Sequence, residues 1–152
     1  MARWQQEVAA ENSGRPIVRA LLPILGEWCR RRVWLTYHVT QVLSGHGCFG
    51  KYLGRIGREP TTQCHHCGEA QDTARHTLEE CPAWSAPRRV LRGIIGMDLS
   101  LVAVVDHMVA DDRSCQALAS FCEEVMTQKE AAERERKADL LSARNQRQRE
   151  WA

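Results

Sequence analysis

Hydrophobic side chains recur every three or four residues along most of the chain, the spacing of one buried face of an α-helix. The pattern predicts a first helix after Pro16, interrupted at Pro23 because proline lacks the amide hydrogen that a helix interior needs. A second helix is expected to end in the turn at Gly45, and a short third helix at Gly57. No alternation of polar and apolar residues is long enough to require a strand. The expected fold class is all-α.

The second half of the chain continues the helical pattern. Asp98 or Ser100 is placed to cap one helix, because a short polar side chain accepts a hydrogen bond from a free amide at a helix start. A long C-terminal helix is expected to start near residues 111–114 and to keep one apolar face through Met126. Charged residues then replace that face, so residues 129–152 are expected to form a solvated helical tail.

Composition and charge divide this single domain-sized chain of 152 residues further. The expected segments are a basic helical segment (1–62), a Cys/His-rich segment with the short helix after it (63–97), C-terminal helices (98–128) and a charged solvated helical tail (129–152). Residues 13–62 carry eight Lys or Arg side chains against two acids, whereas residues 98–139 carry ten acids against five bases. The first stretch is therefore the better candidate to face phosphate, although a merely solvated surface has the same charge.

Seven cysteines raise the question of the redox compartment. The longest apolar run, Ala20 to Leu25, is far too short for a membrane span, and Met1 to Glu7 lacks the apolar stretch of a secretory signal. A reducing compartment is expected, so the cysteines are predicted to be metal ligands or core residues rather than disulfides.

One cluster has the spacing of a metal site, C-x2-C-x8-H-x4-C, formed by Cys64, Cys67, His76 and Cys81. Gly68 allows the chain to reverse behind the first pair, and a short helix containing His76, capped by Asp72 or Thr73, would supply the second pair. Three thiolates and one neutral imidazole complete a tetrahedral shell. The sequence therefore predicts a structural Zn²⁺ site.

Several alternatives compete with this interpretation. His65 or His66 could replace a ligand, but both lie inside the C-x2-C turn, where their rings more naturally point outward. A zinc hydrolase would need an open coordination position, and no H-E-x-x-H motif occurs. The pair Asp111-Asp112 superficially resembles polymerase aspartates, yet it lies between two expected helices, where acids suit a helix start. No catalytic residue is predicted, and the chain is expected not to be an enzyme.

Three stretches together resemble a known family: Thr40–Gly57, Cys64–Gly68 and Asp72–Trp84. They are similar to the C-terminal end of insect type-1 non-LTR retrotransposon polyproteins, a resemblance that covers most of the chain. In that family the region follows the reverse-transcriptase domain and carries a CCHC zinc knuckle that helps to hold nucleic acid during target-primed reverse transcription. The eight-residue loop differs from the four-residue loop of retroviral knuckles, and polymerase and endonuclease are absent from these residues.

The resemblance implies partners and a compartment for this transposable-element segment. RNA or DNA, and the reverse-transcriptase domain of a parent protein, are the expected partners, in the nucleus, with no membrane and no small-molecule substrate. The cations predicted to contact phosphate flank the zinc site: Lys51, Arg55, Arg58, Arg88, Arg89 and Arg92. Trp84 could stack on a base, although packing within the domain is preferred. The competing hypothesis is a protein-interaction module whose helix from Cys115 to Met126 docks on a polymerase domain or a second copy.

Overall fold

The computed structural model describes residues 14–151, so the start of the expected 1–62 segment, with Met1 to Glu7, and residue 152 lie outside the described part. The described residues form helices and no strand, which confirms the all-α prediction. The helices are α2 (Pro16–Leu21), η1 (Leu22–Ile24), α3 (Leu25–Arg31), α4 (Tyr37–Ser44), α5 (Gly50–Arg55), η2 (His76–Glu80), η3 (Pro82–Trp84), α6 (Ser85–Ile95), α7 (Leu101–Ala110) and α8 (Asp112–Glu150).

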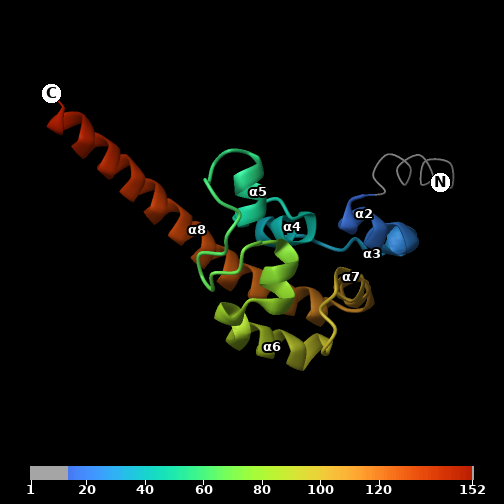
Figure 1. Ribbon diagram of the computed structural model, residues 1–152. Helices are drawn as coiled ribbons and strands as arrows, with labels where there is room; N and C mark the ends of the chain where they lie inside the picture. The colour runs from blue at the N-terminus through green and yellow to red at the C-terminus, as the bar shows by residue number, and fades with distance from the viewer. Residues whose placement is uncertain (1–13, 152) are drawn as a thin grey trace.

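The long helix α8 organises the fold (Figure 1). Helices α4, α6 and α7 pack along its N-terminal half, and its C-terminal half extends away from them without another described helix beside it. Helix α8 begins where Asp111 caps it, since the carboxylate accepts a 2.8 Å hydrogen bond from the amide of Ser114. Within the described residues, no helix combines the length and hydrophobicity needed to cross a membrane.

The sequence signals for helix ends correspond to observed ends. Pro23 lies in the single 3₁₀ turn η1 that separates α2 from α3, which confirms the expected interruption. Ser100 caps α7, because its hydroxyl accepts a hydrogen bond from the amide of Ala103. Gly57, two residues after α5 ends, has a φ of 74°, a left-handed conformation that favours glycine.

The hydrophobic core lies between the N-terminal half of α8 and the helices around it. Leu118, Cys122 and Val125 of α8 are completely buried, and so is Val105 of α7. The apolar face from Cys115 to Met126 is therefore covered by the core of this domain. Docking of this helix on a polymerase domain or a second copy stays a hypothesis.

The packed part of α8 is longer than expected. Lys129 and Glu133 are buried, at 2% and 6% exposure, because each meets an oppositely charged side chain from the other half of the domain. The Nζ atom of Lys129 lies 2.8 Å from Asp72, and a carboxylate oxygen of Glu133 lies 3.1 Å from Arg58. The prediction that a solvated tail begins at residue 129 is therefore wrong. The helix is fully exposed only from residue 138.

Candidate metal centre

The first two candidate ligands, Cys64 and Cys67, lie on a tight turn. The amide of Gly68 donates a 2.9 Å hydrogen bond to the carbonyl of Cys64, and the amide of Cys64 donates to the carbonyl of Glu69 at 2.8 Å. Gly68 has a φ of 86°, so the reversal of the chain depends on a residue without a Cβ. This turn directs both thiols to the same side.

The other two candidate ligands, His76 and Cys81, lie at the start and just past the end of the π-helical turn η2. Its hydrogen bond, 2.7 Å from the amide of Cys81 to the carbonyl of His76, joins residues five apart. In an α-helix such residues would point about 140° apart, whereas the wider π-turn brings them to the same side of the helix. Thr73, not Asp72, caps this turn, because its hydroxyl accepts a 3.0 Å hydrogen bond from the amide of His76.

The four ligand atoms of Cys64, Cys67, His76 and Cys81 all lie within 4.8 Å of one another. The two buried sulfurs, of Cys64 and Cys81, are 4.0 Å apart, and the Cys67 sulfur is 3.2 Å from Nε2 of His76. Ligands of one tetrahedral ion at about 2.3 Å are separated by roughly 3.8 Å. The predicted convergence of these four side chains is confirmed, and together they could hold a metal ion.

The surroundings of the cluster also fit a metal ion. Burial raises the pKa of the Cys64 thiol, and that of the Cys81 thiol to about 12, so these sulfurs become thiolates at neutral pH only where a cation offsets the cost. Nδ1 of His76 is buried without a hydrogen-bond partner and lies 3.7 Å from the carboxylate of Glu80. A carboxylate behind the second ring nitrogen is the usual orienting partner of a metal-binding histidine.

Two further histidines lie in the C-x2-C turn but do not join the cluster. His65 lies 3.7 Å from the carboxylate of Glu59. The His66 ring packs on Trp84, with 4.8 Å between ring centroids, and Trp84 itself is buried. Packing of Trp84 within the domain, the preferred prediction, is confirmed, since a tryptophan exposed by only 4% has no face free for a base.

Arg88 corrects the predicted set of phosphate-binding cations. It is 4% exposed, and its guanidinium donates hydrogen bonds to the carbonyls of Leu78 (2.8 Å), Thr77 (3.0 Å) and Cys81 (2.7 Å). These donors hold the carbonyls left free at the end of the π-turn, so they are not available to phosphate. Arg88 is a structural residue that ties α6 to the metal-binding segment, residues 62–84, which carries the four candidate ligands.

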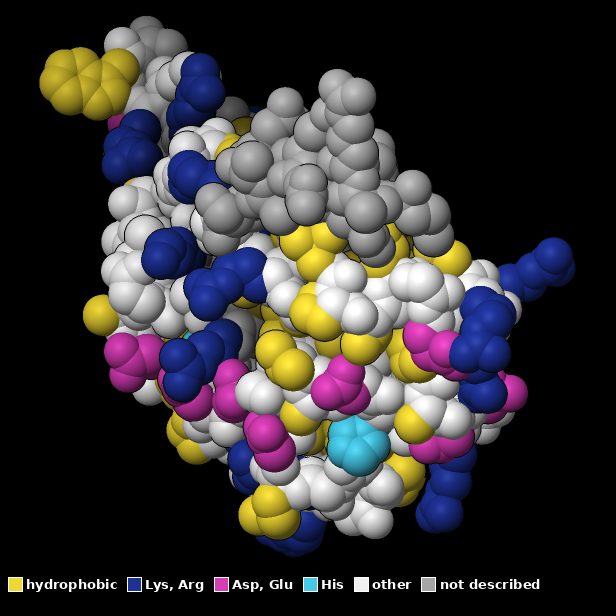
Figure 2. Space-filling view, turned by 90° about the vertical axis from the view of Figure 1, so that its right-hand side faces the viewer, with side chains coloured by type: hydrophobic (Ala, Val, Ile, Leu, Met, Phe, Trp, Pro, Cys, Tyr) yellow, Lys and Arg dark blue, Asp and Glu magenta, His cyan; other side chains and the backbone are white. Residues whose placement is uncertain are grey.

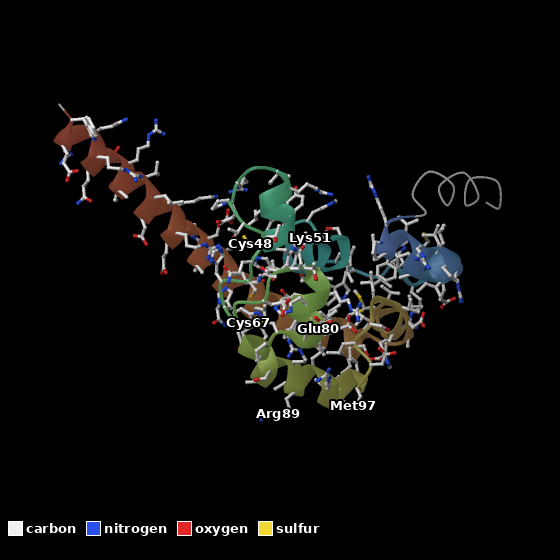
Figure 3. The ribbon with its side chains drawn as sticks, in the orientation of Figure 1. Cys48, Lys51, Cys67, Glu80, Arg89 and Met97 are labelled. Carbon is white, nitrogen blue, oxygen red and sulfur yellow. The ribbon has the colours of Figure 1, made fainter. Side chains whose placement is uncertain are left out.

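The other predicted cations fall into two separate groups. Lys51 and Arg55 are exposed on α5, and the half-exposed Arg58 pairs with Glu133. Arg89 is exposed on α6, and Arg92, partly exposed, donates to the carbonyl of Met97 at 3.3 Å. Figure 3 shows Lys51 beside α5 and Arg89 at the opposite edge of the domain, with the metal-binding segment between them. The fold thus does not gather these cations into one patch.

The pair formed by Asp72 and Lys129 holds the metal-binding segment against α8, and sequence reasoning missed it. Asp72 also accepts a 3.0 Å hydrogen bond from the amide of Gly50. A Cβ at Gly50 would lie 2.6 Å from the carbonyl oxygens of Thr62 and Gln63, so only glycine allows α5 to approach this closely. The available signal was the position of Lys129, which continues the buried three-and-four spacing of α8.

Comparisons with known proteins add no family to this geometry. No protein family model, curated protein or solved structure matches the chain. Its function must come from the arrangement of its own residues.

Proposed function

We propose that this chain is a zinc-stabilised, nucleic-acid-binding module that corresponds to the C-terminal segment of a non-LTR retrotransposon reverse transcriptase. In this role it holds RNA or target DNA during target-primed reverse transcription. Zinc suits the site because three thiolates and one imidazole are borderline-soft donors in tetrahedral spacing. Four protein ligands fill the coordination shell, which suits a structural ion rather than a catalytic one.

The observation that carries this proposal is the connection from the metal centre to the basic face of α6. The candidate ligand Cys81 and the π-turn before it offer three carbonyls to Arg88. Arg88 in turn contributes to a shallow groove of about 410 Å³, which Arg89 and Arg92 also line. A bound ion would therefore fix Arg88 and, through it, the position of α6. Arg89 and Arg92 of that helix then lie beside a groove that is open to an extended anion.

The distribution of charge does not by itself select the binding surface. Figure 2 shows the side of the molecule that carries α2, α3 and α7, where basic, acidic and hydrophobic side chains are interspersed. Asp106 and Asp111 are exposed in this part of the chain, and so are Arg19 and Arg30. Because this face carries charges of both signs, the proposal of binding at α6 rests on the connection of that helix to the metal centre.

The experiment is a titration of the zinc-loaded chain with DNA duplex, RNA and hybrid oligonucleotides at two salt concentrations. Replacing Arg89 and Arg92 by glutamine is expected to weaken binding. It should also reduce the slope of log affinity against log salt concentration by up to about 1.8, the contribution of two phosphate contacts. The matched control replaces Arg19 and Arg113, which are exposed on α2 and at the start of α8. Equal affinities for the two double variants and the unchanged chain, or no loss of binding after zinc is chelated, would contradict the proposal.

A second candidate function, docking on the reverse-transcriptase domain of the parent protein, is favoured by one observation. Val90 and Ile94, one turn apart on α6, are 68% and 37% exposed, and Met97, just after the helix, is 75% exposed. Covering these side chains with another protein would remove apolar surface from water, which is favourable. Replacing Val90 and Ile94 by serine would abolish association with the polymerase domain under this hypothesis while leaving nucleic-acid affinity unchanged, because neither residue lines the groove beside Arg89 and Arg92.

A further inference from the structure

The C-terminal end of α8, residues 138–151, is exposed throughout. It is about 20 Å long, and Figure 1 shows no other described helix beside it. Leu140 and Leu141 are 60% and 59% exposed, and Trp151 is 90% exposed. A helical stretch of this length without packing contacts is only marginally stable in water, so a ligand that contacts it would stabilise it.

The acids of this helical end are absent from one of its faces, whereas Arg149 lies among them on the other side. At about 100° per residue, one face carries residues within about 60° of Arg144: Lys137, Leu140, Leu141, Arg147, Gln148 and Trp151. The acids Glu135, Asp139 and Glu150 all lie at least about 120° away from Arg144. A cationic face without an acid therefore runs along the projecting part of α8.

This cationic face continues the stripe by which α8 packs on the domain. Lys129 and Glu133 lie within about 60° of the direction of Arg144 around the helix. Because Glu133 contacts Arg58, just beyond α5, the projecting face turns toward the side of α8 that carries α5. The exposed Lys51 and Arg55 of α5 thus lie on the same side of α8 as this face.

We propose that the end of α8 is a second nucleic-acid contact, which lies in the major groove of a duplex. An α-helix fits this groove, with Arg144 and Arg147 at phosphates or guanine edges and Gln148 suited to adenine. A helix that runs continuously from a folded domain into the groove is an established docking geometry. The class of ligand rests on the function proposed above, but the site does not use α6 or the metal centre.

The order of side chains on the face favours nucleic acid over other anionic partners. Arg144 lies between Leu140 and Leu141 at the centre of the face, so an apolar protein groove would have to bury an unpaired guanidinium. A membrane-binding helix needs a continuous apolar face, which Arg144 and Arg147 interrupt here. In a nucleic-acid groove, by contrast, Arg144 can pair with the phosphates that border the groove on both sides. Trp151 is free to stack on an unpaired base.

The test compares two double variants of the zinc-loaded full chain on a 20-base-pair DNA duplex between 0.1 M and 1 M salt. Arg144→Gln with Arg147→Gln removes two cations from the proposed face. Arg19→Gln with Arg113→Gln removes the same charge at the other end of the molecule. Glutamine keeps helix propensity, and far-UV circular dichroism checks that α8 persists.

The expected result is specific for the first double variant. Its salt slope should fall by about 1.8, which makes it about 60-fold weaker at 0.1 M when the affinities are equal at 1 M. The control should bind like the unchanged chain. Equal slopes for all three proteins would overturn the proposal, and so would tighter binding of this face to phosphatidylserine vesicles or to an acidic protein than to the duplex.

The function proposed above can fail separately. If replacing Arg89 and Arg92 removes duplex binding while replacing Arg144 and Arg147 does not, the α8 proposal is wrong and the function of α6 stands. If only the α8 variant loses affinity, the α8 contact stands and the α6 interface is wrong. If the unchanged chain binds no duplex, the α8 proposal is overturned, and if it also binds neither RNA nor hybrid, the proposed function is overturned too.

Discussion

Helix α8 contacts two regions that are held in different ways. Toward α4 and α7 it contributes hydrophobic side chains such as Leu118 and Cys122, which are completely buried. Toward the metal-binding segment it contributes charged ones, and the Lys129 ammonium, 2% exposed, lies 2.8 Å from the carboxylate of Asp72. One helix therefore changes from apolar packing to ion pairing within a few turns.

The difference determines how each region responds when a partner is lost. An apolar contact weakens in proportion to the surface and volume removed, whereas a buried ion without its partner retains the whole cost of leaving water. Glu133 shows that such a charge depends on its partners. Burial opposes its ionisation, yet hydrogen bonds from Cys48 and Lys137 and the charge of Arg58 outweigh burial and lower its pKa. The metal-binding region is therefore expected to lose its structure abruptly and the apolar region gradually.

Removal of the proposed zinc ion is expected to have the largest effect. Chelation, or Cys81→Ser, removes a binding free energy of about 10 to 16 kcal/mol, comparable with the whole stability of a domain. Amide hydrogen exchange should show loss of protection over residues 62–84 and retained protection in α7 and the N-terminal half of α8. Cys29→Ser, at an exposed cysteine outside the cluster, is the matched control. Uniform loss of protection, or none, would show that the two regions are not separate.

Loss of the buried ion pair is expected to rank next. Lys129→Met keeps the length of the side chain but leaves Asp72 buried and unpaired, which should lower the free energy of unfolding by about 3 to 5 kcal/mol. Urea denaturation of the zinc-loaded protein measures this change. The double variant with Asp72→Asn should recover most of the loss, because an amide oxygen can still accept the hydrogen bond from Gly50. Additive losses in the double variant would argue against a direct pair.

The same contrast explains what the sequence could predict. Periodic hydrophobic spacing located the helices around Leu118, because apolar residues follow the geometry of the helix. The ligand spacing located the metal cluster, because thiols and imidazoles at such intervals have few other uses. Both signals depend on residue types that rarely occur by chance in such patterns. The helical architecture and the convergence of the four ligands therefore follow from the sequence alone.

The ionic contacts could not be predicted from residue type, because charged residues are normally assigned to solvent. Their positions along the helices were the better signal. Arg88 stands on the buried stripe of α6, three and seven residues before Leu91 and Ile95. Lys129 and Glu133 continue the buried stripe of α8 in the same way. A charged residue is normally assigned to solvent, and its partner, such as Asp72, is distant in sequence. Only the fold reveals which charges meet.

A cavity in the apolar region is expected to have a smaller effect that is independent of the metal. Leu118→Ala removes buried methyl groups and should lower the free energy of unfolding by about 2 to 5 kcal/mol. Zinc affinity, measured by competition with a chelating dye, should stay unchanged, because Leu118 belongs to the apolar region of the core. Leu140→Ala, at an exposed position on the same helix, is the control and should change neither quantity. A weaker zinc affinity in Leu118→Ala would mean that the two regions unfold together.

The smallest expected effect concerns His38, which joins α4 to α8 on the apolar side. Its ring nitrogens lie 2.7 Å from Glu123 and 3.3 Å from Glu130. Burial lowers the pKa of His38, but hydrogen bonds to the two carboxylates outweigh burial, and the pKa is raised above 6.5. The folded state therefore binds this proton more tightly than the unfolded state does. The stabilisation is complete below pH 6.5 and is lost as pH rises through the folded pKa.

His38→Gln should remove this dependence on pH. The difference in the free energy of unfolding between the unchanged chain and His38→Gln should decrease from pH 6 toward pH 9, by no more than about 1 kcal/mol because Glu123 is largely exposed and screened by solvent. Urea denaturation of zinc-loaded protein across this range measures it, and His46→Gln, at an exposed position, is the control. A difference that grows with pH would reverse the sign of the linkage. It would mean that burial, rather than the two carboxylates, sets the protonation of His38.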